Sequence, residues 1–268
     1  MRILMTGHNG FLGSLLYEAL AKTHEVHGFD CGTYQEFEVA FQDFRRRGGK
    51  HDIVLHCGAV SNSEDTSNTL WQLNYQASTQ IADYCEQTDT KLVFISSAAA
   101  IDPQTPYGWS KHCAEFYLRQ KVARMNLCIL RPFNIWGFNE AEKTNPSIVY
   151  KILTGRLERV YWRCTRDFVH VSDVAAAIRS VIDDWTPGTF SIGTAAPTDI
   201  ATLVNLLYNQ SGCTYPKPPV VAECPIAEIL MAEKDELLPN WKPTPIPEYL
   251  DEMQAFMQTD VEPPPIET

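Results

Sequence analysis

The sequence has 268 residues, of which 44% are hydrophobic, so it can bury the core of one large domain with or without a small appendage. The formal net charge of -11 would repel a phosphate backbone, and the basic cluster Arg45 to Arg47 is short, so we expect no nucleic-acid partner. Because no apolar run approaches the roughly 20 residues of a membrane span and the N-terminus lacks a signal-peptide pattern, we expect a cytoplasmic protein without a membrane partner.

Apolar runs of strand length alternate with segments of helical period in the first half of the chain. We predict strands at 2–6, 25–29, 52–57, 91–96 and 127–131, and helices at 11–23, 34–47, 68–88 and 107–123. This alternation is typical of an α/β protein with a doubly wound parallel sheet that carries helices on both faces.

After Pro132 the alternation loosens, which indicates a smaller C-terminal lobe interleaved with the first unit. We expect a helix at 147–153, a strand near 167–171 and a helix at 172–183, with a proline-rich loop at 215–219 and a frayed tail at 261–268. Residues 1–133 and about 167–192 are assigned to the cofactor-binding domain. Residues of about 134–166 and 193–268 are assigned to the C-terminal lobe.

The first predicted strand leads into a glycine turn with the spacing Gly7, Gly10 and Gly13. Glycines at these points permit a tight turn, a close approach of backbone to pyrophosphate and close helix packing. Asp30 ends the second strand about 20 residues later, where a carboxylate can bind a ribose diol and repel a 2′-phosphate. The pattern favours NAD over NADP. The alternative for the glycine motif is a loop without a ligand, and the alternative for Asp30 is a turn residue before Gly32.

A second motif combines Tyr107 and Lys111, whose spacing of four places phenol and ammonium on one helical face. A nearby cation lowers a phenol pKa and lets tyrosine exchange a proton near neutral pH. Ser97 follows the fourth strand, where the carboxyl ends of parallel strands meet a ligand crevice. The plainer alternatives are a surface pair for Tyr107 and Lys111 and a helix or loop cap for Ser97.

Several segments together resemble the extended short-chain dehydrogenase/reductases that modify nucleotide sugars: the glycine turn, HCGAVS, LNYQAS, FISSAA, YGWSK, LRPFNIWG and RDFVHVSDVA, over residues 1 to about 207. The resemblance implies a Rossmann fold, a nicotinamide cofactor and a nucleotide-sugar substrate. It also implies that Tyr107 exchanges protons, that Lys111 binds the cofactor ribose, and that Ser97 bonds the substrate. Further cofactor contacts implied are Gly7, Asn9, Gly10, Phe11, Leu12, Gly13, Asp30, Cys57, Gly58, Ala59, Ser61, Asn74, Tyr107, Lys111 and Ile135. Asn134 is implied to be a substrate contact or a polar group that positions the backbone. Arg166 is implied to be a substrate contact, with a surface ion pair to Asp167 as the alternative.

Within this family the residues favour epimerisation. Ala98 and Ala99 stand where sugar dehydratases carry an Asp-Glu pair, and Lys143 falls nine residues after Asn134, where ADP-L-glycero-D-manno-heptose 6-epimerases have a second proton-transfer base. The alternative for Lys143 is a solvated loop lysine. The short segment from Ser97 to Tyr107 differs from those epimerases. A 4-keto-sugar reductase or oxidase and a non-catalytic NAD-sensing protein are the competing functions.

Other polar and aromatic residues are interpreted as structural. His56 and His170 lie in apolar strands and are expected in the core. Trp136 and Trp162 are expected to pack within the smaller lobe. The eight cysteines form no pattern of zinc ligands, so we expect reduced thiols and no metal. By analogy with the family, the helices at 68–88 and 107–123 are expected to pair across a homodimer.

Overall fold

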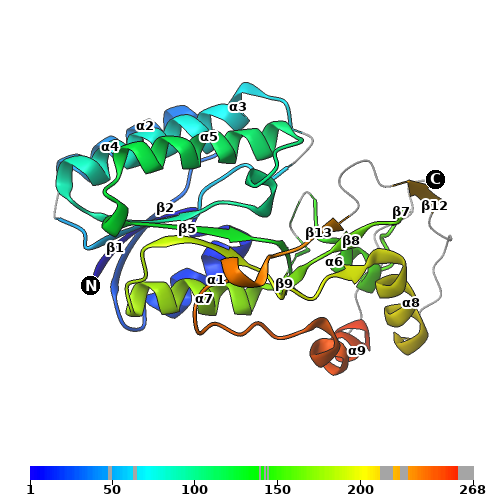
Figure 1. Cartoon of the computed structure of the whole chain (residues 1–268). Helices are drawn as coiled ribbons and strands as arrows, with labels where there is room; N and C mark the ends of the chain where they lie inside the picture. Colours follow the sequence, from blue (N-terminus) through cyan, green and yellow to red (C-terminus); the bar gives the residue numbers. More distant parts are fainter. Residues whose placement is uncertain are drawn as a thin grey trace.

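The computed structural model describes residues 1–47, 50–62, 65–138, 140–141, 143, 145–211, 220–223 and 229–258. Its main sheet has six strands, all parallel, in the order β10-β5-β4-β3-β1-β2 (Figure 1). The strands are β1 (Arg2–Thr6), β2 (Glu25–Phe29), β3 (Ile53–His56), β4 (Lys91–Ile95), β5 (Leu127–Pro132) and β10 (Gly188–Ile192). The predicted doubly wound α/β fold and its first five strands are confirmed.

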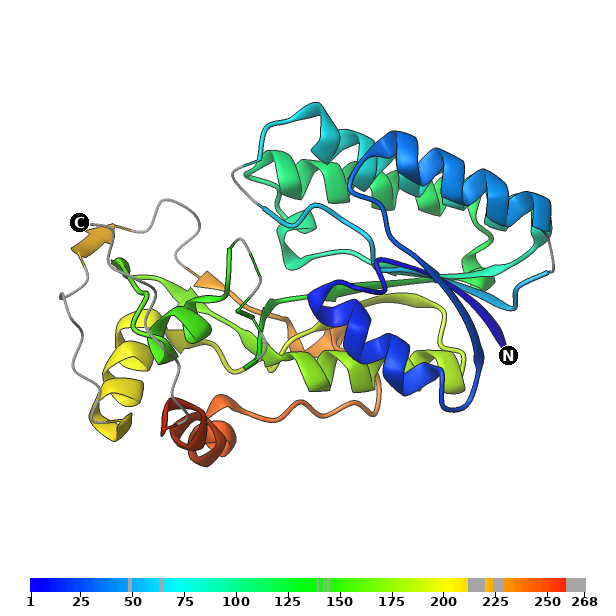
Figure 2. The ribbon, with the colours of Figure 1, turned by 180° about the vertical axis from the view of Figure 1, so that it is seen from behind.

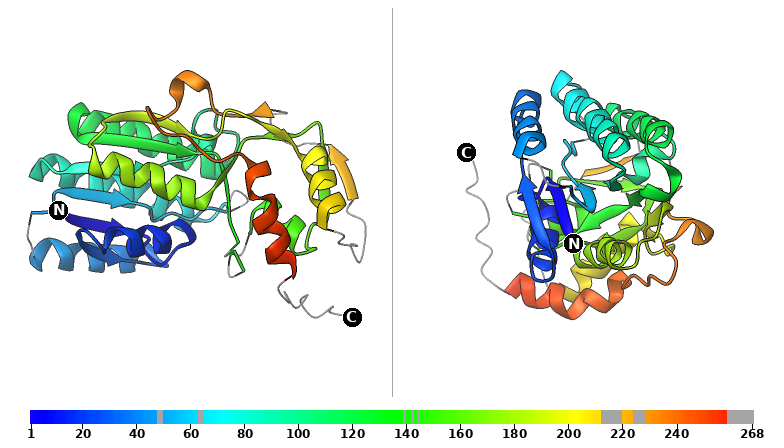
Figure 3. Two further views of the ribbon diagram at one scale, coloured as in Figure 1. Left: turned by 90° about the horizontal axis from the view of Figure 1, so that it is seen from below. Right: turned by 90° about the vertical axis from the view of Figure 1, so that its left-hand side faces the viewer.

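Helices cover both faces of this sheet, as the end-on view in Figure 3 shows. One face carries α2 (Tyr34–Arg47), α3 (Asn68–Trp71), α4 (Ala77–Thr88) and α5 (Pro106–Lys121), and the other carries α1 (Phe11–Leu20) and α7 (Val171–Asp183). Each interface is an apolar core: Leu16 and Ile178 pack with strand residues on the α1 side, and Phe41 and Ile81 on the α2 side. The strands are buried because both faces are covered.

The helix predicted at 68–88 is interrupted by a π-helical turn, η1 (Gln72–Gln76). The turn lies between α3 and α4, and it holds Asn74, which is fully buried. Such turns add one residue to a helical repeat and often occur at functional sites. The hydrophobic period gave no sign of this turn, because the buried apolar residues keep helical steps of three and four through it, at Leu70, Leu73, Ala77 and Ile81.

The chain order of the strands reverses between β1 and β3. Thr6, the last residue of β1, is paired with Phe29 of β2 on one side and with His56 of β3 on the other. Because all three strands are parallel, their carboxyl ends open at the same edge of the sheet. In doubly wound sheets this reversal point is where ligands bind.

The smaller lobe lies beyond the carboxyl ends of the strands (Figure 2). Its strands are β6 (Asn134–Trp136), β7 (Arg159–Trp162), β8 (Thr165–Arg166), β9 (Phe168–His170), β11 (Thr198–Asp199), β12 (Val220–Glu223) and β13 (Ile229–Leu230). Its helices are α6 (Ile148–Leu153), α8 (Ile200–Ser211) and α9 (Leu250–Gln258). These helices bury an apolar core with Trp136, Leu203 and Met253.

Short 3-10 turns complete the chain at η2 (Ala98–Ala100), η3 (Arg124–Asn126), η4 (Lys234–Glu236) and η5 (Ile246–Tyr249). The expected loop at 215–219, the tail at 261–268, Cys213 and Cys224 lie outside the described residues. The six described cysteines form no disulfide bond with one another. Within the described part, no helix is long and apolar enough to cross a membrane, and no cluster of histidine, cysteine and acidic side chains could hold a metal.

Candidate active site

The glycine turn after β1 has the close backbone packing that the motif predicts. Gly7 has a φ of +74°, and a β-carbon on it would lie 2.6 Å from the Gly58 nitrogen. A β-carbon on Gly13 would overlap the Gly7 carbonyl oxygen, so neither position accepts a side chain. Gly10 precedes α1, and among the described residues no side chain caps this helix and no acidic residue stands in its first turn. The amino end of α1 therefore suits an anion such as pyrophosphate.

Asp30 follows β2 and contacts this turn. Its Oδ2 accepts a hydrogen bond of 2.7 Å from the Asn9 backbone N–H and lies 2.9 Å from Nδ1 of His8. Asp30 borders a cavity of about 240 Å³, which is also lined by Thr6, Gly7, Gly10, Cys31, Gly32, His56, Cys57, Gly58, Ala59, Val60 and Leu73. These residues come from the ends of β1, β2 and β3, so the cavity lies at the reversal point of the sheet. The glycine turn and the carboxylate at the border fit a dinucleotide with a free ribose diol.

Other residues expected near the cofactor lie around this cavity or behind it. Phe11 and Leu12 open α1 and are half-buried, and Ile135 lies in β6 and packs against the core under α1 and α7. Ser61 is exposed on the loop that follows β3. Sequence spacing alone did not separate the residues that border the cavity from those that support it.

Asn74 acts on the loop after β3. Its Oδ1 accepts a hydrogen bond of 2.8 Å from the Val60 N–H, and its Nδ2 donates to the Val60 carbonyl at 2.9 Å and to Ser110 Oγ at 3.0 Å. Because both ends of the amide are engaged, the buried Asn74 fixes the loop that lines the cavity. The same loop is tied to β1 by the hydrogen bond from the Gly58 N–H to Thr6 Oγ1.

Ser97 and Tyr107 come together at the end of β4. Ser97 caps the 3-10 turn η2, and its Oγ accepts a hydrogen bond of 3.2 Å from the Ala99 N–H. The first turn of α5 packs tightly on this segment, since a β-carbon on Gly108 would lie 2.6 Å from the Ala99 carbonyl oxygen. Burial raises the pKa of the Tyr107 phenol, and the Ser97 hydroxyl, as a hydrogen-bonding partner, lowers it.

Lys111 lies one turn further along α5 and is only 2% exposed. Its Nζ donates a hydrogen bond of 2.9 Å to the Ile95 carbonyl, at the end of β4, and lies 4.8 Å from the centre of the Phe94 ring. Burial lowers the pKa of Lys111 to about 8, against the opposing effects of Cys57 and Glu115. The structure thus places an ammonium with a low pKa beside the strand end that carries the serine.

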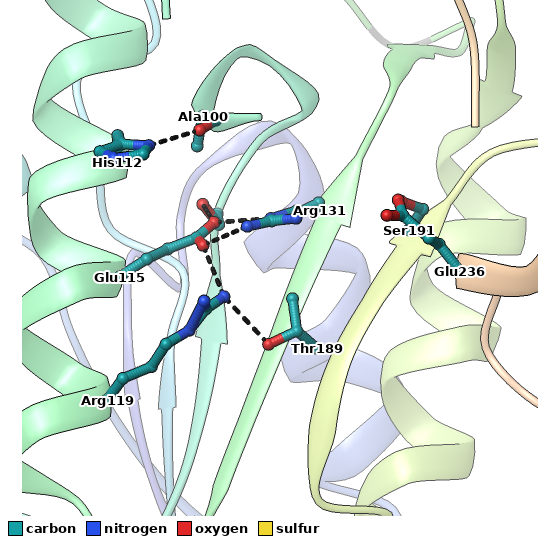
Figure 4. A network of polar contacts seen from close by, with 9 residues as sticks. Ala100, His112, Glu115, Arg119, Arg131, Thr189, Ser191 and Glu236 are labelled. Atoms are coloured by element: carbon teal, nitrogen blue, oxygen red, sulfur yellow. Dashed lines mark hydrogen bonds and ion pairs between the residues drawn. The ribbon is translucent and has the colours of Figure 1, made fainter. Parts of the chain in front are cut away.

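Glu115 is a buried residue of this region that was not predicted from the sequence. It lies four residues after Lys111 on α5 and bonds Ser96, Arg119 and Arg131 (Figure 4). The signal was present in the sequence, because a carboxylate at a spacing of four from Lys111 occupies the same helical face. Its partner Arg131 in β5 could not be inferred from that spacing.

Lys143 lies against α1. Its Nζ donates a hydrogen bond of 2.8 Å to Glu140 Oε2 and lies 4.3 Å from the centre of the Phe11 ring. Glu140 is fully buried and also accepts hydrogen bonds from the N–H groups of Gly137 at 2.9 Å and Ser147 at 2.6 Å. Lys143 is thus a loop lysine whose side chain is 27% exposed and paired with a buried carboxylate. A buried carboxylate holds this ammonium beside the first residue of the helix that follows the glycine turn.

The two expected substrate contacts lie where the main sheet meets the smaller lobe. Nδ2 of Asn134 donates a hydrogen bond of 2.7 Å to the Asp167 carbonyl, and Nη1 of Arg166 donates one of 2.9 Å to the Thr165 carbonyl. The Asp167 side chain is fully buried and accepts from the N–H groups of Thr194, Ala195 and Ala232. A surface ion pair between Arg166 and Asp167 is therefore wrong.

The histidines and the tryptophan interpreted as core residues are buried. His56 bonds Thr6 Oγ1 at 2.6 Å and Ser78 Oγ at 3.0 Å, and burial lowers its pKa to about 3. His170 directly precedes α7 and packs edge-on against the buried Trp136. The expected burial of these three side chains is confirmed, but His170 Nε2 has no hydrogen-bond partner among the described residues. The Trp162 side chain lies outside the described part of the chain.

The glycine turn lies at the reversal point of a parallel sheet, the serine follows β4, and the tyrosine and the lysine lie on α5. This arrangement defines a dinucleotide-binding protein of the short-chain dehydrogenase/reductase class. A family comparison agrees with this class. Residues 3–193 match the model of the NAD dependent epimerase/dehydratase family, and the chain belongs to that family.

Solved structures of three enzyme types share the fold. The UDP-glucose 4-epimerase of Thermus thermophilus, in complex with NAD, is 23% identical with a TM-score of 0.74, over 97% of this chain and 100% of that one. The dTDP-glucose 4,6-dehydratase of Bacillus anthracis, also with NAD, is 18% identical with a TM-score of 0.76, over 96% of both chains. The dTDP-4-dehydrorhamnose reductase of the same organism, with NADP, is 17% identical with a TM-score of 0.73, over 94% and 98%. One fold thus serves an epimerase, a dehydratase and a reductase.

Proposed function

We propose that this protein is an NAD-dependent nucleotide-sugar epimerase that works through a transient keto sugar. The observation that carries the proposal is the meeting of Ser97, Tyr107 and Lys111 at the end of β4, where Lys111 also interacts electrostatically with the cavity residue Cys57. When bound, NAD would accept a hydride from the sugar and return it. Tyr107 as phenolate would accept the proton of the sugar hydroxyl when the keto sugar forms, and as phenol it could return that proton. Ser97 would orient the sugar oxygen and Lys111 would stabilise the phenolate.

Two alanines favour epimerisation over dehydration. Ala98 is buried and Ala99 half-buried directly after Ser97, and their methyl groups cannot act as acid or base. Elimination of water needs a proton donor and acceptor near the leaving hydroxyl. Beside the cofactor turn, the Lys143 ammonium contacts the Phe11 ring and is held by Glu140.

Lys143 is proposed as the second proton-transfer group, as in ADP-heptose 6-epimerases. Inversion of a carbon requires that hydride leaves and returns on opposite faces of the sugar, so a proton donor facing Tyr107 is chemically useful. The Lys143 ammonium lies 2.8 Å from Glu140 Oε2, and we propose that it donates the proton that the keto oxygen takes up when hydride returns. The contact with the Phe11 ring keeps the ammonium near the cofactor turn.

The lobe formed by residues of about 134–166 and 193–268 is proposed to bind the nucleotide sugar. Arg166 suits a diphosphate because its guanidinium offers several N–H donors in one plane. Asn134 stands at the start of β6 and joins this lobe to the main sheet through the Asp167 carbonyl. Mass spectrometry of ligands that copurify with the protein would identify the nucleotide and the sugar.

The second candidate is a reductase or oxidase of a 4-keto nucleotide sugar, favoured by the Ser97, Tyr107 and Lys111 set, which serves such reactions equally well. The decisive experiment incubates purified protein with a panel of UDP, dTDP, GDP and ADP sugars. Isomerised sugar without net consumption of NADH supports the epimerase, whereas stoichiometric oxidation of NADH supports the reductase. A non-catalytic NAD-sensing protein would bind NAD and turn over nothing.

A homodimer is proposed through α4 and α5. On α5, Trp109 and Phe116 are 49% and 67% exposed, and their spacing of seven puts them on one face of the helix. Exposed aromatic side chains on one helical face indicate a surface that a second protein chain covers. Light scattering should report a dimer, and substitution of Trp109 and Phe116 by glutamate should give a monomer. The same change at Val39, exposed on α2, is the control.

A further inference from the structure

The carboxylate of Glu115 is 3% exposed and joins three parts of the fold (Figure 4). Oε1 accepts hydrogen bonds of 2.6 Å from Ser96 Oγ and 2.9 Å from Arg131 Nε. Oε2 accepts hydrogen bonds of 2.6 Å from Arg131 Nη2 and 2.9 Å from Arg119 Nη2. The buried carboxylate is held in place by two guanidinium groups and one hydroxyl donor. These partners replace the water that the buried charge has lost.

The positions of these partners along the chain connect Glu115 to the catalytic residues. Ser96 follows the last residue of β4 and directly precedes Ser97, and its N–H bonds the Leu130 carbonyl of β5 at 2.7 Å. On α5, Glu115 lies four residues after Lys111 and eight after Tyr107, so the three side chains share a helical face. One carboxylate thus ties the strand end that carries the serine to the helix that carries the tyrosine.

A second bond holds the other side of the serine segment. Nδ1 of His112, also on α5, lies 2.8 Å from the Ala100 carbonyl oxygen. Ser97 therefore lies between two points that are anchored to α5, one at Ser96 and one at Ala100. Of these two anchors, the one at Ser96 is buried and charged, and next to it Lys111 bonds the Ile95 carbonyl from the same helix. Such bonds resist displacement better than a bond at the surface.

We propose that Glu115 is a positioning residue that holds the Ser97 hydroxyl against the Tyr107 phenol through its hydrogen bond to Ser96. The inference rests on the proposed function for its kinetic readout. It assigns Glu115 no contact with substrate or cofactor. Proton exchange depends on the distance between the two hydroxyl groups, so a shift of the strand end changes turnover before it changes cofactor binding.

The test uses Ser96→Ala in the full chain, because this change removes the link and leaves Glu115 with its two arginines. We expect kcat to fall about tenfold, since small displacements of catalytic groups are costly, with NAD affinity changed less than about twofold. In protein labelled with ¹³C-tyrosine, the Tyr107 resonance, assigned by its loss in Tyr107→Phe, should titrate at higher pH than in wild type. The phenol has then lost the serine partner that lowers its pKa.

Two further variants separate positioning from simple stabilisation. Arg119→Gln removes an outer partner, whose side chain is 42% exposed, and leaves the Ser96 link intact, so kcat and the Tyr107 titration should not change. Glu115→Gln disturbs the bidentate contact with Arg131 and should reproduce the Ser96→Ala titration. It should also shift the alkaline loss of NAD binding to lower pH, because Lys111 loses a neighbouring negative charge.

The inference is overturned if folded Ser96→Ala, judged by circular dichroism and NAD binding, keeps wild-type kcat and an unchanged Tyr107 titration. Should Ser96→Ala fail to fold, Glu115→Gln with an unchanged titration overturns it instead. If wild-type protein turns over no nucleotide sugar, the proposed function fails, but the Tyr107 titration still decides the positioning role.

Discussion

Lys111 donates its hydrogen bond to the carbonyl of Ile95, the last residue of the strand that leads to Ser97. This ammonium is buried without a carboxylate in contact among the described residues. Burial of a cation is unfavourable, and it lowers the pKa of Lys111 from the ordinary 10.5 to about 8. The buried ammonium therefore lowers the stability of the folded protein, and in return a charged group lies beside the reacting hydroxyl groups.

Replacement of Lys111 by methionine should stabilise the cofactor-free protein at pH 7 while abolishing turnover. Between about pH 8 and the ordinary pKa of 10.5, unfolded chains bind more protons at this lysine than folded ones, so wild-type stability rises with pH across that window. The gain in the variant is up to roughly 3 kcal/mol at neutral pH. Urea unfolding at pH 7 and pH 10 measures it. A variant less stable than wild type at pH 7 would contradict the cost assigned to Lys111.

Replacement of Tyr107 by phenylalanine should reduce turnover by about 10²–10⁴-fold, the usual contribution of a general acid–base group. NAD affinity should stay within about twofold, because the phenyl ring keeps the packing. Tyr117→Phe is the matched control on the same helix, where the hydroxyl bonds Asp83 at 2.9 Å far from Ser97 in the chain. Steady-state kinetics and fluorescence titration with NAD provide the measurements, and full activity of the Tyr107 variant would remove the proposed mechanism.

Replacement of Lys143 by methionine should stop epimerisation but permit the half-reaction, seen as reduction of bound NAD by the sugar. The reason is that Tyr107 alone can accept the first proton. Glu140→Gln is the paired variant. It keeps the lysine but removes the charge that holds it, and should lower both activity and stability. If Lys143→Met epimerises at the wild-type rate, the lysine serves only to neutralise Glu140.

Stability should fall on acidification because of His56. Its folded pKa of about 3 lies below the ordinary value of 6.5, so the unfolded chain binds more protons between these values and stability is lost as pH falls. The loss approaches about 1.4 kcal/mol per pH unit for this one group. His56→Gln should flatten the dependence of urea unfolding between pH 4 and pH 6.5. An unchanged slope would show that other groups dominate acid unfolding.

Replacement of Asp30 by asparagine should weaken the preference for NAD over NADP about tenfold or more, because the carboxylate that repels a 2′-phosphate is lost. The amide can still accept the hydrogen bond from the Asn9 N–H, so the turn should persist. Binding constants for both cofactors measure the preference. Asp52→Asn, whose carboxylate bonds the Arg2 N–H at the opposite end of β1, should leave it unchanged.

The local part of the site followed from the sequence. Gly7, Gly10 and Gly13 sit on a single turn, and Tyr107 and Lys111 lie on a single helix, so their relative positions are set by the repeat of the local backbone. The parallel direction of the first five strands was predicted from the alternation of apolar runs, but their order in the sheet was not. These features need no knowledge of distant contacts.

Only the tertiary structure decided which residues from distant segments meet. The pairing of Glu115 with Arg131, the burial of Asp167 and the contact of Lys143 with the Phe11 ring all join different elements. The π-helical turn at Asn74 likewise depends on the loop that its amide binds. The physical reason is that a buried charge or amide takes its partners from whatever the packed fold brings within hydrogen-bonding distance, and periodicity along the chain carries no record of those neighbours.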